Sequence, residues 1–237
     1  MQPELAFVLH TRPYRETSLL VDLFTRSYGR FRAVSRGSRG TKAKTIRLNA
    51  YSQILISWSG KSNLKTLTQV ELSSAPLTLK GDGLFCGFYL NELLIRLLAE
   101  NDPHQTVYDD YANVLDRLAS DTSIACSLRS FEISLLQELG YGINLFTDAE
   151  SDEAIAPEKE YWFEPNVGFL LKQSHDSDRK LINLFKGEDL ISFREGIFYS
   201  APLSAKRLLR LALEPHIGEK PILSRNLFSK IKTSKSI

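Results

Sequence analysis

The sequence predicts a multi-domain α+β protein, in which a small five-stranded barrel precedes a mainly α-helical domain with a small β insertion. Short segments rich in β-branched and aromatic residues, separated by turn residues, occupy the first part of the chain. Apolar residues at helical spacing dominate the remainder. The predicted domains are residues 1–80 and 81–237, with the insertion at about residues 145–175.

The barrel prediction depends on five strand-like segments. They are AFVLHT (6–11), SLLVDLFT (18–25), RFRAVSRG (30–37), YSQILISWSG (51–60) and LKTLTQVEL (64–72). Residues 12–15 are expected to form the first turn. In the third segment Phe31 and Ala33 alternate with Arg30 and Arg32, as expected for one buried and one exposed face. Five short strands with turns at regular intervals indicate a Greek-key barrel, most commonly an OB-fold.

Helical periodicity begins near residue 80. Segments with this spacing are 84–98, 107–118 and 128–139, then 179–187, 204–218 and 224–232. The third ends at Gly140 and Gly142, which are typical of a helix C-cap. Between the two groups, residues 161–171 are expected to form a short β segment with a turn at 165–168. The acidic run 148–153 before it is expected to be a solvated loop.

Charge divides the chain as the periodicity does. Residues 1–80 contain thirteen Lys/Arg and four Asp/Glu, a net charge of +9, whereas the other 157 residues carry −7. A basic barrel indicates a polyanionic ligand, because OB-folds bind single strands with a cationic groove and stacking aromatics. The candidate DNA-binding residues are Arg12, Tyr14, Arg15, Arg30, Arg32, Arg36, Arg39, Lys42, Lys44, Arg47, Trp58, Lys61 and Lys65. The alternative is a solvated basic face with the aromatics in the core.

A second candidate site lies on the predicted helices. Arg129 stands beside Leu128 and Phe131, and Lys206 and Arg210 follow on a later helix. A cation at the rim of an apolar groove suits an extended acidic peptide that ends in a carboxylate. The alternative is an ordinary helix-surface arginine that pairs with Glu132 or with another neighbour.

Several functional classes receive no support from the residues. The glycine-rich stretch SRGSRGTK (35–42) lacks the phosphate-binding pattern of NTPases. The two cysteines and four histidines are scattered and form no predicted metal site or nucleophile–base pair. No apolar run approaches the ~20 residues that span a bilayer, and the N-terminus does not have the pattern of a signal peptide. We therefore expect a cytoplasmic protein that is not an enzyme and uses no cofactor or metal.

Several blocks of the sequence resemble the RecO family of bacterial recombination-mediator proteins. The blocks are FVLHTRPYRETSLLVDLFTRSYGRFRAVSRGSRG (7–40), WSGKSNLKTLTQVE (58–71), LNELLIRLL (90–98), LRSFEISLLQELGYG (128–142) and KPILSRNLF (220–228). They occur in the family's order and cover most of the chain; only residues 148–200 match weakly.

This resemblance implies an N-terminal OB-fold, a helical C-terminal domain and a role in recombinational DNA repair. Members of the family bind single- and double-stranded DNA, anneal complementary strands and act with the ring protein RecR. They also bind the acidic C-terminal tail of single-stranded DNA-binding protein (SSB) and help to load recombinase on SSB-coated DNA. Arg129 matches an arginine of the family's tail-binding groove. The DNA-binding role implied by the resemblance would make this protein nucleoid-associated.

The sequence departs from the family at one point. Many members carry a four-cysteine zinc site after the GYG block, whereas residues 143–171 here contain no cysteine. We expect a zinc-free insertion held together by packing of Tyr161, Trp162, Phe163 and Phe169, in a protein that is a monomer when free. A non-catalytic adaptor whose barrel binds RNA or protein is the alternative function.

Overall fold

The computed structural model describes residues 3–39, 48–60, 64–75, 77–120, 123–173 and 180–227. Its contacts divide the chain into two compact units. Unit 1 comprises residues 1–122 and 222–237, and unit 2 comprises residues 123–221. Four of the predicted DNA-binding residues, Lys42, Lys44, Arg47 and Lys61, lie outside the described residues.

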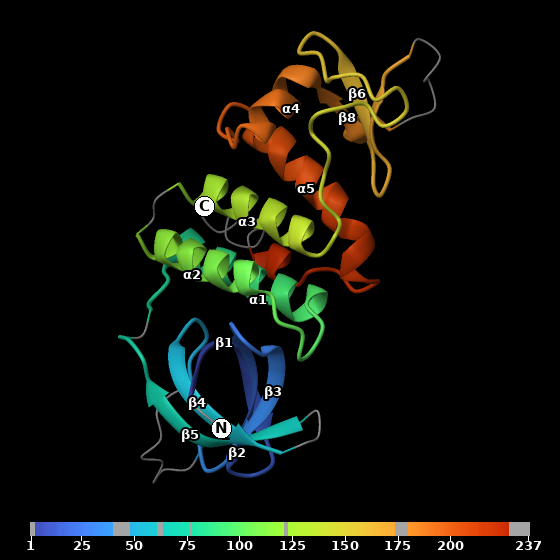
Figure 1. Ribbon diagram of the computed structural model, residues 1–237. Coiled ribbons are helices and arrows are strands. Elements are labelled where there is room, and N and C mark those ends of the chain that lie inside the picture. The colour runs from blue at the N-terminus through green and yellow to red at the C-terminus, as the bar shows by residue number, and fades with distance from the viewer. Residues whose placement is uncertain are drawn as a thin grey trace. The chain divides into compact units, whose positions relative to one another are not determined.

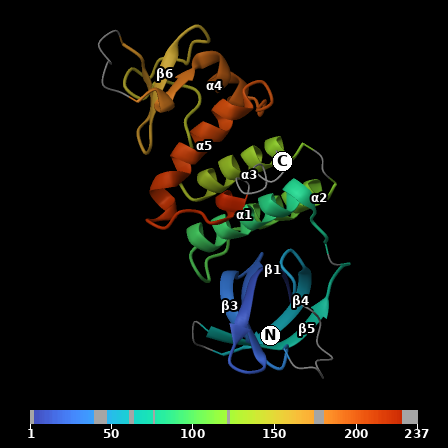
Figure 2. The ribbon, with the colours of Figure 1, turned by 180° about the vertical axis from the view of Figure 1, so that it is seen from behind.

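Unit 1 is built on a closed five-stranded barrel with the strand order β1-β2-β3-β5-β4 (Figures 1 and 2). All neighbouring strands are antiparallel except β3 and β5. The strands are β1 (Glu4–Tyr14), β2 (Ser18–Thr25), β3 (Gly29–Ser35), β4 (Gln53–Ser59) and β5 (Leu64–Leu72). The predicted five-stranded OB-fold barrel is confirmed.

The barrel interior follows the alternation in the sequence. Phe31 and Ala33 of β3 point inward and are at most 1% exposed. They belong to a cluster with Ala6, Val8, Val21, Leu23, Leu48, Ile54, Ile56, Trp58 and Leu67. Because side chains alternate along a strand, the residues between these members face outward.

The predicted turn at residues 12–15 is wrong. β1 continues to Tyr14, and the turn follows it, with Arg15 at φ +52°. Pro13 is tolerated in this strand because β1 pairs with β4 only over residues 4–7, so that its last part has one free edge. The longer strand carries Arg12 and Tyr14 on the barrel wall instead of in a loop.

Two helices cover one end of the outer barrel face. Tyr108 and Tyr111 of α2 (Gln105–Ala119) pack on Phe7, with ring centroids 5.2 and 5.1 Å apart. Asn91 of α1 (Gly81–Leu97) donates a hydrogen bond to the Leu9 carbonyl at 2.6 Å and accepts one from the Tyr111 hydroxyl. These contacts explain why the compact unit extends beyond the predicted boundary at residue 80.

A segment near the C-terminus also belongs to unit 1. The Glu92 carboxylate on α1 accepts hydrogen bonds from the backbone N–H groups of Leu223 and Ser224 and from the Ser224 hydroxyl, at 2.7–2.9 Å. Arg96 pairs with the same carboxylate at 2.7 Å. Residues 222–227 are thereby tied to α1, a long-range contact that the sequence pattern did not indicate.

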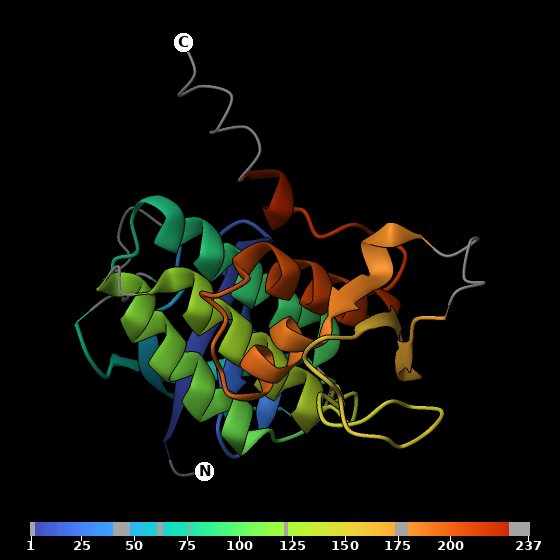
Figure 3. The same cartoon turned by 90° about the horizontal axis from the view of Figure 1, so that it is seen from above.

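Unit 2 combines helices with a small antiparallel sheet of order β7-β6-β8. Figure 3 shows α4 beside α5 in this unit. Its elements are α3 (Ile124–Glu138), β6 (Glu160–Glu164), β7 (Gly168–Leu171), the 3-10 helix η1 (Leu181–Asn183), β8 (Leu184–Lys186), α4 (Gly187–Arg194) and α5 (Pro202–Ile217). The β segment expected at 161–171 is confirmed as β6 and β7.

The helix predicted at residues 179–187 is wrong, because the described part of this segment forms η1 and β8. Phe185 of β8 is 1% exposed and packs edge-on against Phe163 and Phe169, at 6.3 and 6.1 Å. Burial of this ring in the sheet outweighs the local helical periodicity. The expected aromatic packing is confirmed, since Tyr161, Trp162, Phe163 and Phe169 are all at most 3% exposed.

The acidic run contains one buried carboxylate where a solvated loop was expected. Asp148 is 4% exposed and accepts hydrogen bonds from the N–H groups of Glu150, Ser151 and Leu171 and from the Ser151 hydroxyl. It therefore joins the loop to β7. Burial alone would raise the pKa of Asp148, but the hydrogen bonds outweigh burial and lower the pKa from 3.8.

We expect the Asp148→Asn substitution to lower the free energy of unfolding at pH 7 by about 1–3 kcal/mol, because a buried charged acceptor is lost. A carboxyl whose pKa is lower in the folded state stabilises the fold above its unfolded pKa. This stabilisation disappears as the pH falls below about 4, so the variant and the wild type should converge there. Urea unfolding at several pH values measures the difference. Glu153→Gln, at an exposed side chain of the same loop, is the control and should show no such convergence.

Candidate nucleic-acid interface

The outer face of β1, β2 and β3 forms a continuous surface whose residues change from apolar at one end to charged towards the other. Cross-strand register aligns its residues in rows, in order Phe7–Phe24–Arg30, His10–Asp22–Arg32, Arg12–Leu20–Val34 and Tyr14–Ser18. The first row is apolar apart from Arg30 and is covered by α2. Charged groups occupy the second row, and the end beyond it carries cations. Among the described residues, the cations of this face that lack an ion pair therefore lie at the end away from α2, whereas Arg32 in the second row is ion-paired.

Four exposed arginines gather at this basic end. Arg12 projects from β1, Arg15 from the turn after it, and Arg36 and Arg39 from the turn after β3. The two turns are adjacent, because Arg39 N–H donates to the Thr17 carbonyl at 3.0 Å. Among the described residues, none of the four arginines is ion-paired with a carboxylate. We name this set, together with Tyr14, the arginine cluster.

Tyr14 is the one predicted aromatic that belongs to the cluster. Its side chain is partly exposed, and the Arg15 guanidinium lies 5.3 Å from its ring centroid. An exposed ring beside unpaired cations is the combination on which bases stack while the backbone phosphates bind the cations. The cluster therefore has the chemistry of a single-strand binding surface.

Trp58 does not belong to this surface, contrary to the prediction. It is 6% exposed and packs inside the barrel, 4.8 Å from the Phe31 ring. Lys65 lies opposite Ala33 in the β3–β5 register and two residues before Leu67. Ala33 and Leu67 are core residues. Lys65 therefore lies on the inner side of β5, not on the outer face beside Arg32. Strand alternation could have identified both positions.

Arg30 and Arg32 differ from the cluster because they are ion-paired. Arg30 is buried between Asp22 at 3.6 Å and Glu100 at 3.7 Å, and Arg32 pairs with Glu100 at 2.8 Å. Burial lowers the pKa of Arg30, which Glu100 and Asp22 oppose. Burial raises the pKa of Asp22, which Arg30, His10 and Arg32 oppose. Arg30 is thus a structural cation, and Arg32, at 43% side-chain exposure, borders the exposed surface.

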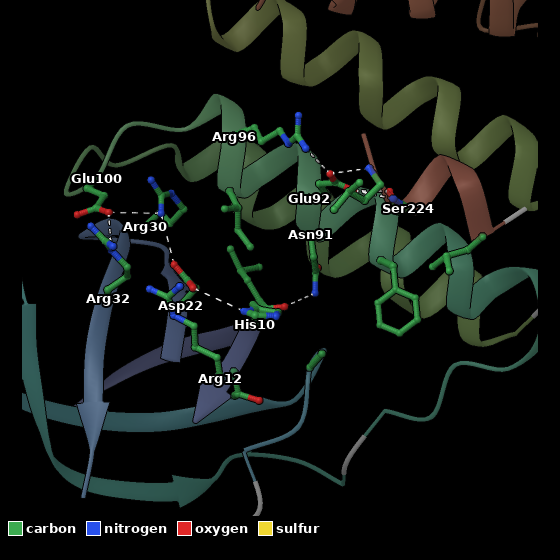
Figure 4. A pocket seen from close by; sticks show the side chains of 17 residues that line it. His10, Arg12, Asp22, Arg30, Arg32, Asn91, Glu92, Arg96, Glu100 and Ser224 are labelled. Carbon is green, nitrogen blue, oxygen red and sulfur yellow. Dashed lines mark hydrogen bonds and ion pairs between the residues drawn. The ribbon is translucent and has the colours of Figure 1, made fainter. Parts of the chain in front are cut away.

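A hollow of about 860 Å³ adjoins these charges within unit 1 (Figure 4). The figure shows Arg12, Asp22 and Arg32 on the barrel side, opposite Asn91, Glu92 and Arg96 of α1. Leu9, Phe88, Ile95, Leu223 and Leu227 supply apolar lining. Of the arginine cluster, Arg12 lines this hollow, which extends from the outer face of the barrel to α1.

The second predicted site is rearranged in the structure. Leu128 and Phe131 are 6% and 3% exposed and therefore offer no surface to a peptide. The Arg129 side chain is 11% exposed and pairs with Glu132 of the same helix at 2.7 Å, as in the ordinary alternative. Lys206 and Arg210 do lie on the exposed face of α5, with Leu203 at 81% exposure beside them.

No metal-binding constellation stands out in the described ranges, which contain no group of three or more His, Cys, Asp or Glu residues able to hold an ion. In residues 143–171, where the resemblance would imply a zinc site, the structure has Asp148 hydrogen-bonded to backbone N–H groups and the aromatic sheet. The residues present therefore do not fit a zinc site there. In the same ranges, no helix has the length and apolar character needed to cross a membrane.

Comparison with known proteins agrees with this architecture. The family model described as "Recombination protein O N terminal" matches residues 1–76, and "Recombination protein O C terminal" matches residues 80–226. A protein named DNA repair protein RecO from Coxiella burnetii (strain RSA 331) is 42% identical over 228 residues, covering 94% of this chain and 96% of the relative. Its namesake from Haemophilus influenzae is 40% identical over 237 residues, covering 97% and 98%.

A further relative of that name, from Aliivibrio fischeri (strain MJ11), is 38% identical over 226 residues, covering 94% of this chain and 93% of the relative. The structure thus defines a class of protein in which an OB-fold barrel with exposed arginines precedes a region of helices. Within that class, the chain belongs to the recombination protein O family of DNA repair proteins. The resemblance identified from the sequence blocks is confirmed.

Proposed function

We propose that the chain is a non-enzymatic recombination mediator that binds single- and double-stranded DNA through its barrel and anneals complementary strands. Together with RecR it would help to load recombinase on SSB-coated DNA. The observation that carries the proposal is the arginine cluster: four exposed guanidinium groups without carboxylate partners among the described residues, at one end of an OB-fold.

The mechanism follows from charge neutralisation. Two complementary strands repel each other through their phosphates, and cations that bind phosphates release condensed counterions and weaken this repulsion. A guanidinium can bind two phosphate oxygens, whereas a ring such as Tyr14 stacks on any base. The barrel can thus hold strands without reading their sequence, as annealing requires.

The annealing test uses two complementary oligonucleotides pre-coated with SSB, with a chelator present. The proposal expects the protein to accelerate annealing in a salt-sensitive and chelator-insensitive manner. Absence of acceleration by the folded protein would favour the alternative of a non-catalytic adaptor whose barrel binds RNA or protein. Competition between labelled DNA and RNA of equal sequence then separates these ligands.

The helical unit supplies the candidate surface for the SSB tail. On α5 an exposed apolar side chain, Leu203, precedes the exposed cations Lys206 and Arg210. Such a face suits a short acidic peptide with an apolar, carboxylate-bearing end. Arg129 is left out of this candidate surface, because its side chain is 11% exposed and pairs with Glu132.

We expect Lys206→Gln with Arg210→Gln to weaken binding of an SSB-tail peptide by at least about tenfold, because two charge-assisted contacts are removed. Fluorescence anisotropy with a labelled tail peptide measures the change, and affinity for naked single strands should stay the same. Lys172→Gln with Lys186→Gln alters charge equally at exposed lysines elsewhere in unit 2 and is the control. Unchanged peptide affinity in the α5 variant would place the tail elsewhere.

A monomeric state in the free protein, association with RecR and a nucleoid location in the cytoplasm remain part of the proposal. Their support is the chain's membership of the family. Analytical ultracentrifugation of the protein alone and with RecR tests the first two directly.

A further inference from the structure

Arg32 stands at the border of the arginine cluster but is chemically unlike its members. It lies on the outer face of β3, which leads into the turn that carries Arg36, and it lines the hollow together with Arg12. Its side chain is 43% exposed, and yet its Nε lies 2.8 Å from the carboxylate of Glu100. A strand that follows the cluster along the barrel face would next reach a cation that already has an anionic partner.

Glu100 is held in this position by the backbone around it. It lies in the connection between α1 and α2, where Asn101 N–H donates to the Arg30 carbonyl at 2.7 Å and Arg30 Nε donates to the Leu98 carbonyl at 3.1 Å. Gly29 approaches the same connection so closely that a Cβ there would lie 1.9 Å from the Asp102 carbonyl oxygen. The backbone that carries Glu100 is therefore fixed against β3, which keeps its carboxylate within reach of Arg30 and Arg32.

Glu100 also has a second cation within reach. Arg30, which is buried and pairs with Asp22, lies 3.7 Å from the Glu100 carboxylate. If Arg32 turned towards another anion, Glu100 would keep Arg30 as a partner and would not be left unpaired, which would otherwise be costly. The arrangement thus has two accessible pairings for one carboxylate.

We propose that Glu100 is a built-in competitor of DNA phosphate, which occupies Arg32 in the free protein and gives it up when a strand extends along the barrel face. A carboxylate and a phosphate bind the same guanidinium donors, so the exchange lowers the net gain from each strand bound. This inference rests on the proposed function and adds a means of limiting affinity. A protein that anneals strands must release the duplex, and Glu100 sets how readily that occurs.

The test compares Glu100→Gln with Glu71→Gln in salt titrations of a labelled single strand. Glu71 is an exposed acid on β5, so its replacement changes the net charge of the barrel equally without freeing Arg32. We expect Glu100→Gln to tighten binding about two- to fivefold beyond the Glu71→Gln control, as for loss of a partly exposed ion-pair competitor. The log–log salt slope should steepen by about 0.7, which corresponds to one additional phosphate contact.

A double-mutant cycle with Arg32→Gln identifies the route of the effect. If Glu100 acts by occupying Arg32, Glu100→Gln should have no effect beyond the control when Arg32→Gln is also present. The inference is overturned if Glu100→Gln increases DNA affinity equally with Arg32 present and with Arg32→Gln. It is also overturned if the wild type binds DNA but Glu100→Gln binds no more tightly than Glu71→Gln. Failure of every folded variant, and of the wild type, to bind DNA would instead overturn the proposed function. Thermal unfolding checks that each variant is folded.

Discussion

The triple substitution Arg15→Gln, Arg36→Gln and Arg39→Gln is expected to reduce affinity for single-stranded DNA on the order of a hundredfold at low salt, because three phosphate contacts are lost. Each contact contributes about 0.7 to the log–log salt slope, so the slope should flatten by about two units. These side chains lie on two adjacent turns, are exposed, and support no ion pair among the described residues. The fold should therefore be preserved, and fluorescence anisotropy at several salt concentrations measures both quantities.

The control for this experiment changes the same charge elsewhere. Lys159→Gln, Lys186→Gln and Lys220→Gln remove three exposed cations from unit 2. A general electrostatic attraction would weaken equally in both triple variants. If the interface lies at the arginine cluster, the control variant should lose little affinity for single-stranded DNA, whereas the cluster variant should lose much. Equal slopes in the cluster variant and the wild type would contradict the assignment of this surface.

The second large effect is expected from Gly29→Ala, which should lower the free energy of unfolding of unit 1 by at least about 3 kcal/mol. Gly29 has φ +68°, a conformation unfavourable for alanine. The added Cβ would also lie 1.9 Å from the Asp102 carbonyl oxygen, in backbone that cannot move without releasing the α1–α2 connection from β3. Strain and overlap therefore add.

A matched glycine separates the two causes. Gly37 has φ +69°, but a Cβ there would meet no atom within 4 Å. Gly37→Ala should therefore cost only about 1 kcal/mol, from backbone strain alone. Urea unfolding followed by the fluorescence of Trp58, in a Trp162→Phe background, reports on the barrel because the chain has two tryptophans. Similar losses in both alanine variants would show that close packing at Gly29 contributes little.

Most of the barrel could be predicted because its information is local. Alternation placed Phe31 and Ala33 inside, and turn residues separated the strands in the right order. Trp58 was assigned to the surface because an aromatic residue among cations reads the same whether it stacks on bases or fills a core. The alternation along β4, in which Ile54, Ile56 and Trp58 share the inner face, would have assigned it to the core.

The parts that sequence reasoning missed depend on long-range contacts. Arg30 was counted as a surface cation, but Asp22 and Glu100 bury it between a strand and an inter-helix connection. Phe185 lies in a segment with helical spacing and becomes a strand because β6 offers it a partner. The periodicity of the sequence does not indicate such long-range partners. Counting charges along the sequence therefore overestimated how many barrel cations lack an ion pair.

The rate at which complementary, SSB-coated oligonucleotides anneal, compared between the wild type and the triple cluster variant at about 50 and 200 mM salt, tests the central claim most directly. If the DNA strands bind at the arginine cluster, the wild type accelerates annealing strongly at low salt and weakly at high salt. The cluster variant then shows little acceleration at either concentration. Full acceleration by the variant would contradict the account, as would a folded wild type that leaves the annealing rate unchanged.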